Sequence, residues 1–90
     1  MMSETTPDEG VASPFRSVIE VVARALVDQP DAVRITETER RGMSVLELRT
    51  APADMGKIIG RQGRTAAAFR TLLAVTAEKH GARAQLDIRD

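Results

Sequence analysis

The apolar residues of this chain switch between two spacings along its length, and this switching is the strongest constraint on its fold. They recur first at helical spacing, then at every second residue in two short runs, then at helical spacing again, and finally at every second residue. A helical spacing predicts a helix with one apolar stripe, and a period of two predicts a strand with one apolar side. The chain therefore alternates helices and strands that each need a partner on one side only.

The first helical run begins at Ser13-Pro14. Ser13 can accept a hydrogen bond from a free backbone amide as the N-cap, and Pro14 suits the first helical position because its missing N–H has no partner there. The apolar stripe that follows comprises Phe15, Val18, Ile19, Val22 and Leu26. Residues 1–12 are polar and acidic with almost no apolar side chains, which predicts a disordered tail and leaves residues 13–90 as one folded domain.

The next two runs predict a β-hairpin with one buried side. In the first, Val33 and Ile35 alternate with polar residues, and in the second Leu46 and Leu48 do so. Glu39-Arg40-Arg41-Gly42 supplies a polar turn between them, and we interpret Arg40 and Arg41 as solvent-exposed turn residues.

A short and a long helix are predicted after the hairpin. Asp54 is placed to cap a short helical turn over Met55–Ile59. The longer helical pattern follows Gly63 and runs to His80, where Gly81 can end it by adopting a left-handed conformation.

The last run, in which Ala84, Leu86 and Ile88 alternate with polar residues, predicts a third strand and completes the order α-β-β-α-α-β. A hairpin makes the first two strands antiparallel, and a crossover through two helices makes the second and third parallel. We therefore predict an α+β two-layer sandwich, in which three helices cover one face of a three-stranded mixed sheet.

Composition excludes several classes of function. The chain has no cysteine and one histidine, so we expect no disulfide, metal site or cofactor. No apolar run approaches the ~18 residues that would span a bilayer, and no signal segment is evident, so we expect a cytoplasmic location and no membrane association. No catalytic set can be assembled, which predicts that the protein is not an enzyme and has no small-molecule substrate.

Charge is balanced overall but segregated along the chain. There are 13 basic and 13 acidic residues, yet residues 55–77 hold no acid and four bases, Lys57, Arg61, Arg64 and Arg70. A locally positive surface predicts phosphate binding that is modest and only weakly dependent on salt. With Phe15 and Phe69 both expected in the core, no aromatic residue remains to stack on bases.

The positive stretch contains a loop bounded by glycines, Gly60-Arg61-Gln62-Gly63. Glycine at both ends permits a sharp turn and lets a sugar-phosphate backbone approach closely. The helix that follows should direct free amides and its positive dipole end at a bound anion, and Lys57, Arg61 and Arg64 add formal charge. The loop is therefore predicted to bind phosphate.

This stretch resembles the signature of KH domains, in which an apolar pair, here Ile58-Ile59, precedes Gly-x-x-Gly and a helix. The element order resembles the type II form, and residues 13–89 are similar to the small stand-alone bacterial KH proteins of the KhpA family. The resemblance implies that the loop clamps about four nucleotides of single-stranded RNA. It also implies that the bases lie between the helix pair and the last strand, with Ile58 as an apolar wall. Ala66 departs from the Ile or Val of many KH motifs and should alter the shape of that groove.

The predicted function is that of a non-catalytic RNA-binding protein, either an RNA chaperone or a post-transcriptional regulator. The predicted site comprises Lys57, Ile58, Gly60, Arg61, Gln62, Gly63 and Arg64. The resemblance further implies a homodimer, or a heterodimer with a KH protein of the KhpB (Jag) type. Two alternatives stay open, a KH fold used mainly for dimerisation or protein interaction, and a binder of single-stranded DNA.

Overall fold

The computed structural model describes residues 13–90, so the tail predicted for residues 1–12 lies outside the described residues. The helices and strands, in chain order, are α2 (Pro14–Leu26), β1 (Arg34–Arg40), β2 (Met43–Arg49), α3 (Met55–Ile59), α4 (Arg64–Lys79) and β3 (Arg83–Arg89). Short 3-10 turns stand before β1, before α3 and between α3 and α4. The predicted order α-β-β-α-α-β is confirmed.

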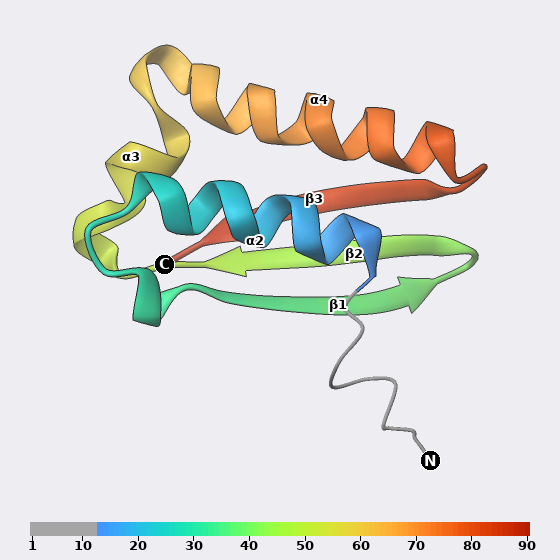
Figure 1. Ribbon diagram of the computed structural model, residues 1–90, viewed down its shortest axis with the longest axis horizontal. Coiled ribbons are helices and arrows are strands. Elements are labelled where there is room, and N and C mark those ends of the chain that lie inside the picture. The colour runs from blue at the N-terminus through green and yellow to red at the C-terminus, as the bar shows by residue number, and fades with distance from the viewer. Residues whose placement is uncertain (1–12) are drawn as a thin grey trace.

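The three strands form one sheet in the order β1-β2-β3. β1 pairs antiparallel with β2, and β2 pairs parallel with β3, which confirms the predicted mixed sheet. The helices lie on one side of the sheet and leave the other side bare (Figure 1). The fold is thus the predicted two-layer α+β sandwich, and both outer strands have an edge without a strand partner within the described residues.

The core lies between the sheet and the helices, and every strand contributes to it. The largest of its fully buried apolar side chains are Ile19, Val33, Leu46, Leu48, Ile58, Phe69 and Leu73. Each side chain of this size stabilises the fold by about 1.5–3 kcal/mol when it leaves water. The two phenylalanines are both buried, as the sequence predicts.

Helix α2 begins as predicted, but the residues that it buries differ slightly from the predicted stripe. The Ser13 hydroxyl accepts a hydrogen bond from the Arg16 N–H at 3.1 Å, which confirms the N-cap. Leu26, at the end of the predicted stripe, is 40% exposed, and Ala23 and Val27 fill the core instead. The reason is that Val27 leaves the helical conformation and turns its side chain inward.

The prediction that Asp54 caps α3 is wrong. Its side chain is 1% exposed and makes no capping bond to α3. Instead, Oδ1 accepts the N–H of Asp28 at 3.1 Å and Oδ2 accepts the N–H of Gln29 at 3.0 Å. These two amides follow the end of α2 and have lost helical partners, so a buried carboxylate satisfies them. Asp54 thereby joins the end of α2 to the start of α3.

Helix α4 ends as its sequence predicts. Gly81 adopts a left-handed conformation with φ +63°, and the Ala82 N–H bonds back to the Ala77 carbonyl at 2.8 Å. This arrangement satisfies carbonyls that the helix end would leave free and turns the chain into β3. The rings of His80 and Phe15 pack in a T-shaped arrangement, with centroids 6.1 Å apart.

Candidate nucleic-acid interface

The loop between α3 and α4 is a tight turn of left-handed residues. Gly60, Gln62 and Gly63 have φ values of +77°, +57° and +73°. A Cβ atom on Gly60 would lie 2.2 Å from Thr65 Oγ1, so this position excludes any side chain. A Cβ on Gly63 would meet open space, so only the backbone conformation favours glycine there. The two glycines of the motif therefore serve different physical needs.

Three backbone amides of the loop are already bonded inside the protein. Gly60 N–H donates to the Gly56 carbonyl at 2.8 Å, Gly63 N–H to the Gly60 carbonyl at 3.1 Å, and Arg64 N–H to the Arg61 carbonyl. The prediction that the first amides of the following helix are directed at an anion is therefore wrong for Arg64. Arg61 and Gln62 precede the first bond that the 3-10 turn Arg61–Gly63 makes within itself, so the turn supplies no acceptor for their N–H groups. Within residues 13–90, neither N–H group donates to a side chain or to a carbonyl outside the helices. These two amides are the backbone donors that the loop offers.

The loop side chains surround those donors with positive charge. Arg61, Gln62 and Arg64 are exposed, and Arg64 Nη2 donates to Gln62 Oε1 at 3.3 Å. Neither arginine is within 4 Å of a carboxylate in the described part of the chain. An anion at the loop would thus meet two backbone donors and two uncompensated guanidinium groups.

Lys57 lies beside the loop, but its charge is shared with carboxylates. Its Nζ is 3.2 Å from Asp28 Oδ2 and 4.0 Å from Asp54 Oδ1. These contacts draw α3 toward the end of α2. Lys57 is consequently a weaker partner for an anion than Arg61 or Arg64, because a phosphate would compete with two existing partners.

Ile58 does not form the exposed apolar wall that the resemblance implies. Its side chain is 0% exposed and belongs to the core, because α3 packs that side against α4 and α2. Ala66 is also buried. Both residues set the packing beneath the loop and lie out of reach of a ligand in this structure.

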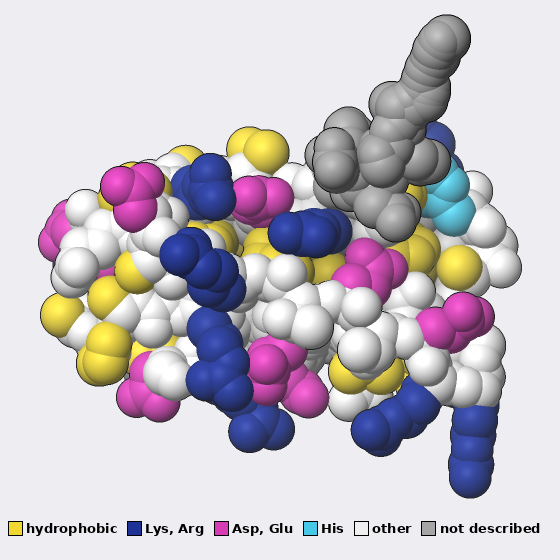
Figure 2. Space-filling view, turned by 90° about the horizontal axis from the view of Figure 1, so that it is seen from below, with side chains coloured by type: hydrophobic (Ala, Val, Ile, Leu, Met, Phe, Trp, Pro, Cys, Tyr) yellow, Lys and Arg dark blue, Asp and Glu magenta, His cyan; other side chains and the backbone are white. Residues whose placement is uncertain are grey.

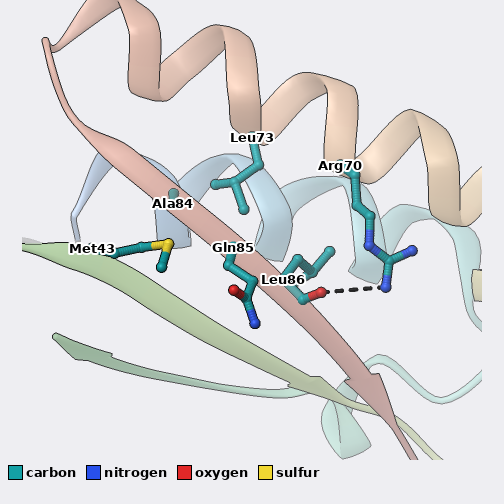
Figure 3. A pocket seen from close by; sticks show the side chains of 6 residues that line it. All are labelled: Met43, Arg70, Leu73, Ala84, Gln85 and Leu86. Carbon is teal, nitrogen blue, oxygen red and sulfur yellow. Dashed lines mark hydrogen bonds between the residues drawn. The ribbon is translucent and has the colours of Figure 1, made fainter. Parts of the chain in front are cut away.

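Arg70, which the sequence pattern leaves outside the predicted site, reaches the outer edge of β3. Its Nη2 donates to the Leu86 carbonyl at 3.3 Å (Figure 3). A shallow pocket of about 290 Å³ lies there between α4 and β3. It is lined by Met43, Arg70, Leu73, Ala84, Gln85 and Leu86. The available signal was the position of Arg70 between Phe69 and Leu73 of the buried stripe, which directs it to the border of the sheet.

Two kinds of feature are absent from the described residues. None of these residues forms a group of three or more side chains suited to hold a metal ion. No helix within residues 13–90 has the length and apolar character needed to cross a bilayer.

Known proteins match this chain over nearly all of its described length. The family model for the KH domain of KhpA/KhpB matches residues 16–88. A protein of Aquifex aeolicus named RNA-binding protein KhpA is 46% identical over 76 residues, which cover 84% of this chain and 96% of the relative. A protein of the same name from Halalkalibacterium halodurans is 45% identical over 76 residues, or 84% of this chain and 100% of the relative. A third, from Leifsonia xyli, is 46% identical over 69 residues, or 77% of this chain and 88% of the relative.

Proposed function

The chain belongs to the KhpA/KhpB family of KH domains, and from this we propose that it binds single-stranded RNA and catalyses no reaction. Relatives that share almost half of its residues are named RNA-binding proteins. The observation that carries the proposal is an exposed turn that supplies no acceptor for the N–H groups of Arg61 and Gln62. Within residues 13–90, Arg61 and Arg64 also have no carboxylate within 4 Å. An RNA chaperone or a post-transcriptional regulator fits such binding.

The loop is proposed to hold the backbone of about four nucleotides. A phosphate oxygen accepts from the N–H groups of Arg61 and Gln62, and the guanidinium groups of Arg61 and Arg64 add paired donors and charge. Gly60 and Gly63 supply the backbone conformation that exposes those donors. Lys57 contributes weakly because of its two carboxylates, and Ile58 contributes only through the packing beneath the loop.

The bases are proposed to lie along the pocket beside β3. Met43 and Ala84, which are partly exposed, offer apolar surface there, and the Leu86 carbonyl and Arg70 offer an acceptor and donors. The single 3.3 Å bond between them can be exchanged for bonds to the edge of a base. Because the pocket has no aromatic side chain, base stacking adds little, and we expect a weak base preference.

A pair of charge-matched variants tests the site. Arg61→Asp with Gln62→Asp changes the charge of the loop by −3, and Arg40→Gln with Arg41→Asp changes the hairpin turn by the same amount. We expect the loop variant to bind a single-stranded RNA at least about tenfold more weakly in fluorescence anisotropy, because an acidic loop repels phosphate. The hairpin variant should stay within about twofold of the parent. Equal losses in both variants, or none in the loop variant, would refute the assignment.

RNA and single-stranded DNA are separated by competition. The 2′-hydroxyl distinguishes the two strands, so matched oligomers of one sequence isolate its contribution. We expect RNA to displace a labelled RNA at lower concentration than DNA does. Equal displacement would favour a general binder of single strands.

We further propose that the protein pairs with a second copy of itself or with a KH protein of the KhpB (Jag) type. The observation in favour is apolar surface on the outer side of the helices. Val21 of α2 is 69% exposed and Val75 of α4 is 59% exposed. An apolar groove on α2 is lined by Ser17, Val18, Val21 and Val22. Pairing would link two weak RNA sites and raise their effective concentration.

Sedimentation of Val21→Glu and Val75→Glu variants tests pairing. Both side chains are exposed, so the charge should leave the fold intact while opposing burial at an interface. We expect a parent dimer and monomeric variants. A parent that is monomeric alone and in the presence of the second KH protein would refute pairing.

A further inference from the structure

The face of the sheet that no helix covers carries a row of three arginines. Arg34 of β1 is opposite Arg49 of β2, and Arg49 is opposite Arg89 of β3. Their strand neighbours Ile35 and Leu48 are buried beneath the helices, so alternation directs the arginines to the uncovered face. Figure 2 shows a band of Lys and Arg side chains across this face. We call Arg34, Arg49 and Arg89 the arginine row.

The arginine row opposes the stability of the sheet. Neighbouring strands are about 4.8 Å apart, and like charges directly opposite each other are destabilising. Glu47 compensates part of this charge, with Oε1 3.2 Å from Arg49 Nε and Oε2 2.9 Å from Arg89 Nε. Arg34 has no carboxylate within 4 Å in the described part of the chain, and its Nη1 donates to the carbonyls of Asp31 and Val33. The row therefore keeps an excess of positive charge.

The remaining charged residues on this face also leave an excess of positive charge. Asp87 lies opposite Glu47, and Arg40 and Arg83 lie toward the hairpin end, so the three strands place five arginines and two carboxylates on this face. Asp90, which follows β3, adds a third acidic residue beside the row, and its carbonyl accepts from Arg49 Nη1 at 3.3 Å. Mixed charges placed in alternation would keep a bare sheet soluble and would also attract one another across the strands. Lining up like charges gives up that attraction. Such a departure from a stable arrangement is expected where a surface binds a ligand.

The chemistry of the row favours phosphate. All the basic residues on this face are arginines, whereas the two lysines of the chain, Lys57 and Lys79, lie on helices. A guanidinium group binds phosphate through paired donors in a fixed plane, which an ammonium group cannot do. The face also has no aromatic residue, so it suits a sugar-phosphate backbone better than stacked bases.

The row lies at the same end of the molecule as the loop. Arg49 is the last residue of β2, and the chain continues directly into α3 and the loop. Figure 1 shows α3 and the C-terminal end of β3 together at that end. We propose that the arginine row binds the phosphates of the same RNA strand beyond the nucleotides that the loop holds. This inference rests on the proposed function, and it extends the binding surface around the end of the sheet.

The test compares two RNA lengths and two charge-matched variants. One RNA has about six nucleotides, close to what a KH loop clamps, and the other has about 16. Arg34→Gln with Arg89→Gln removes two charges from the row and keeps the Arg49–Glu47 pair. Arg16→Gln with Arg24→Gln removes two charges from the exposed side of α2. All four side chains are exposed, so we expect unchanged or higher melting temperatures.

The row variant should bind the short RNA like the parent and the long RNA about tenfold more weakly. Its slope of log affinity against log salt for the long RNA should be shallower by about 1.4, since each lost phosphate contact on a single strand accounts for about 0.7. The α2 variant should match the parent on both. Unchanged binding of the long RNA by the row variant would overturn the inference. So would a change that appears only in the oligomeric state, because the face would then contact protein.

The loop variant with Arg61→Asp and Gln62→Asp separates the two proposals. If its affinity for both RNAs falls while the row variant binds both like the parent, the arginine row is refuted and the proposed function stands. If it retains both RNAs, the proposed function fails. Loss in the row variant alone would then make the bare sheet face the main binding surface and overturn the idea of an extension.

Discussion

The loop Gly60–Gly63 and the hairpin turn Arg40–Gly42 adopt closely similar backbone conformations but offer different chemistry. Each contains two consecutive left-handed residues that end in glycine, with φ of +57° and +73° at Gln62-Gly63 and +53° and +79° at Arg41-Gly42. Both carry exposed arginines. In the hairpin, the turn only connects two paired strands, with Arg40 directly opposite Met43. In the loop, the turn supplies no acceptor of its own for the N–H groups of Arg61 and Gln62 beside α4.

The comparison shows that neither glycine nor arginine makes a phosphate site by itself. The loop differs because two helices hold it on either side and because Gly60 is pressed against Thr65. Those contacts fix which amides point outward. The hairpin turn lacks such contacts, since a Cβ on Gly42 would meet nothing within 4 Å.

The largest expected effect comes from a substitution that removes the support beneath the loop. Asp54→Ala should lower the free energy of unfolding by about 3 kcal/mol, because two backbone N–H groups at the end of α2 lose a buried charged acceptor. Urea unfolding measures this loss. Asp31→Ala removes the same charge from an exposed position and should cost under about 0.5 kcal/mol. Equal costs for the two variants would contradict the role of Asp54.

The next largest effect comes from alanine substitutions at three glycines. Gly60→Ala should cost about 2–3 kcal/mol, because it combines a left-handed backbone with a collision at Thr65. Gly63→Ala and Gly42→Ala should each cost about 1 kcal/mol, because both have open space and only the backbone conformation opposes a side chain. Thermal unfolding of the three variants gives the order. A Gly60→Ala variant as stable as Gly42→Ala would show that the loop is no more constrained than the turn.

Gly63→Ala and Gly42→Ala impose about the same backbone strain, so the RNA affinities of the two variants can be compared directly. We expect Gly63→Ala to weaken RNA binding by about threefold to tenfold, because a methyl group stands where the backbone of the ligand approaches. Gly42→Ala should leave the affinity unchanged. Fluorescence anisotropy with one RNA serves both variants, and equal affinities would argue that the loop has no special role.

The smallest effect concerns Lys57. Lys57→Gln should weaken RNA binding by less than about threefold, because Asp28 and Asp54 already share its charge. Arg61→Gln removes an uncompensated charge and should weaken binding more. A loss for Lys57→Gln that equals or exceeds the loss for Arg61→Gln would mean that its ion pairs open readily for phosphate.

The sequence predicts most of the fold because each strand and helix buries one side, which the spacing of Leu46 and Leu48 or Phe69 and Leu73 reveals directly. It also predicts the loop, because the backbone freedom of glycine and the charge of arginine act at the positions of those residues in the chain. It does not predict the partners of Asp54 and Arg70, since these contacts join residues 26 and 16 positions apart. The expectation that Ile58 forms an exposed apolar wall is wrong for a related reason. The spacing marks it as apolar, but only the packing of α3 decides between core and surface.

The most direct measurement follows the backbone amides by nuclear magnetic resonance while a short single-stranded RNA is added. We expect the N–H signals of Arg61 and Gln62 to shift most, and those of Arg41 and Gly42 to stay in place. Shifts of equal size in the loop and the hairpin turn, or unmoved signals for Arg61 and Gln62 at saturating RNA, would show that the loop does not hold the RNA backbone.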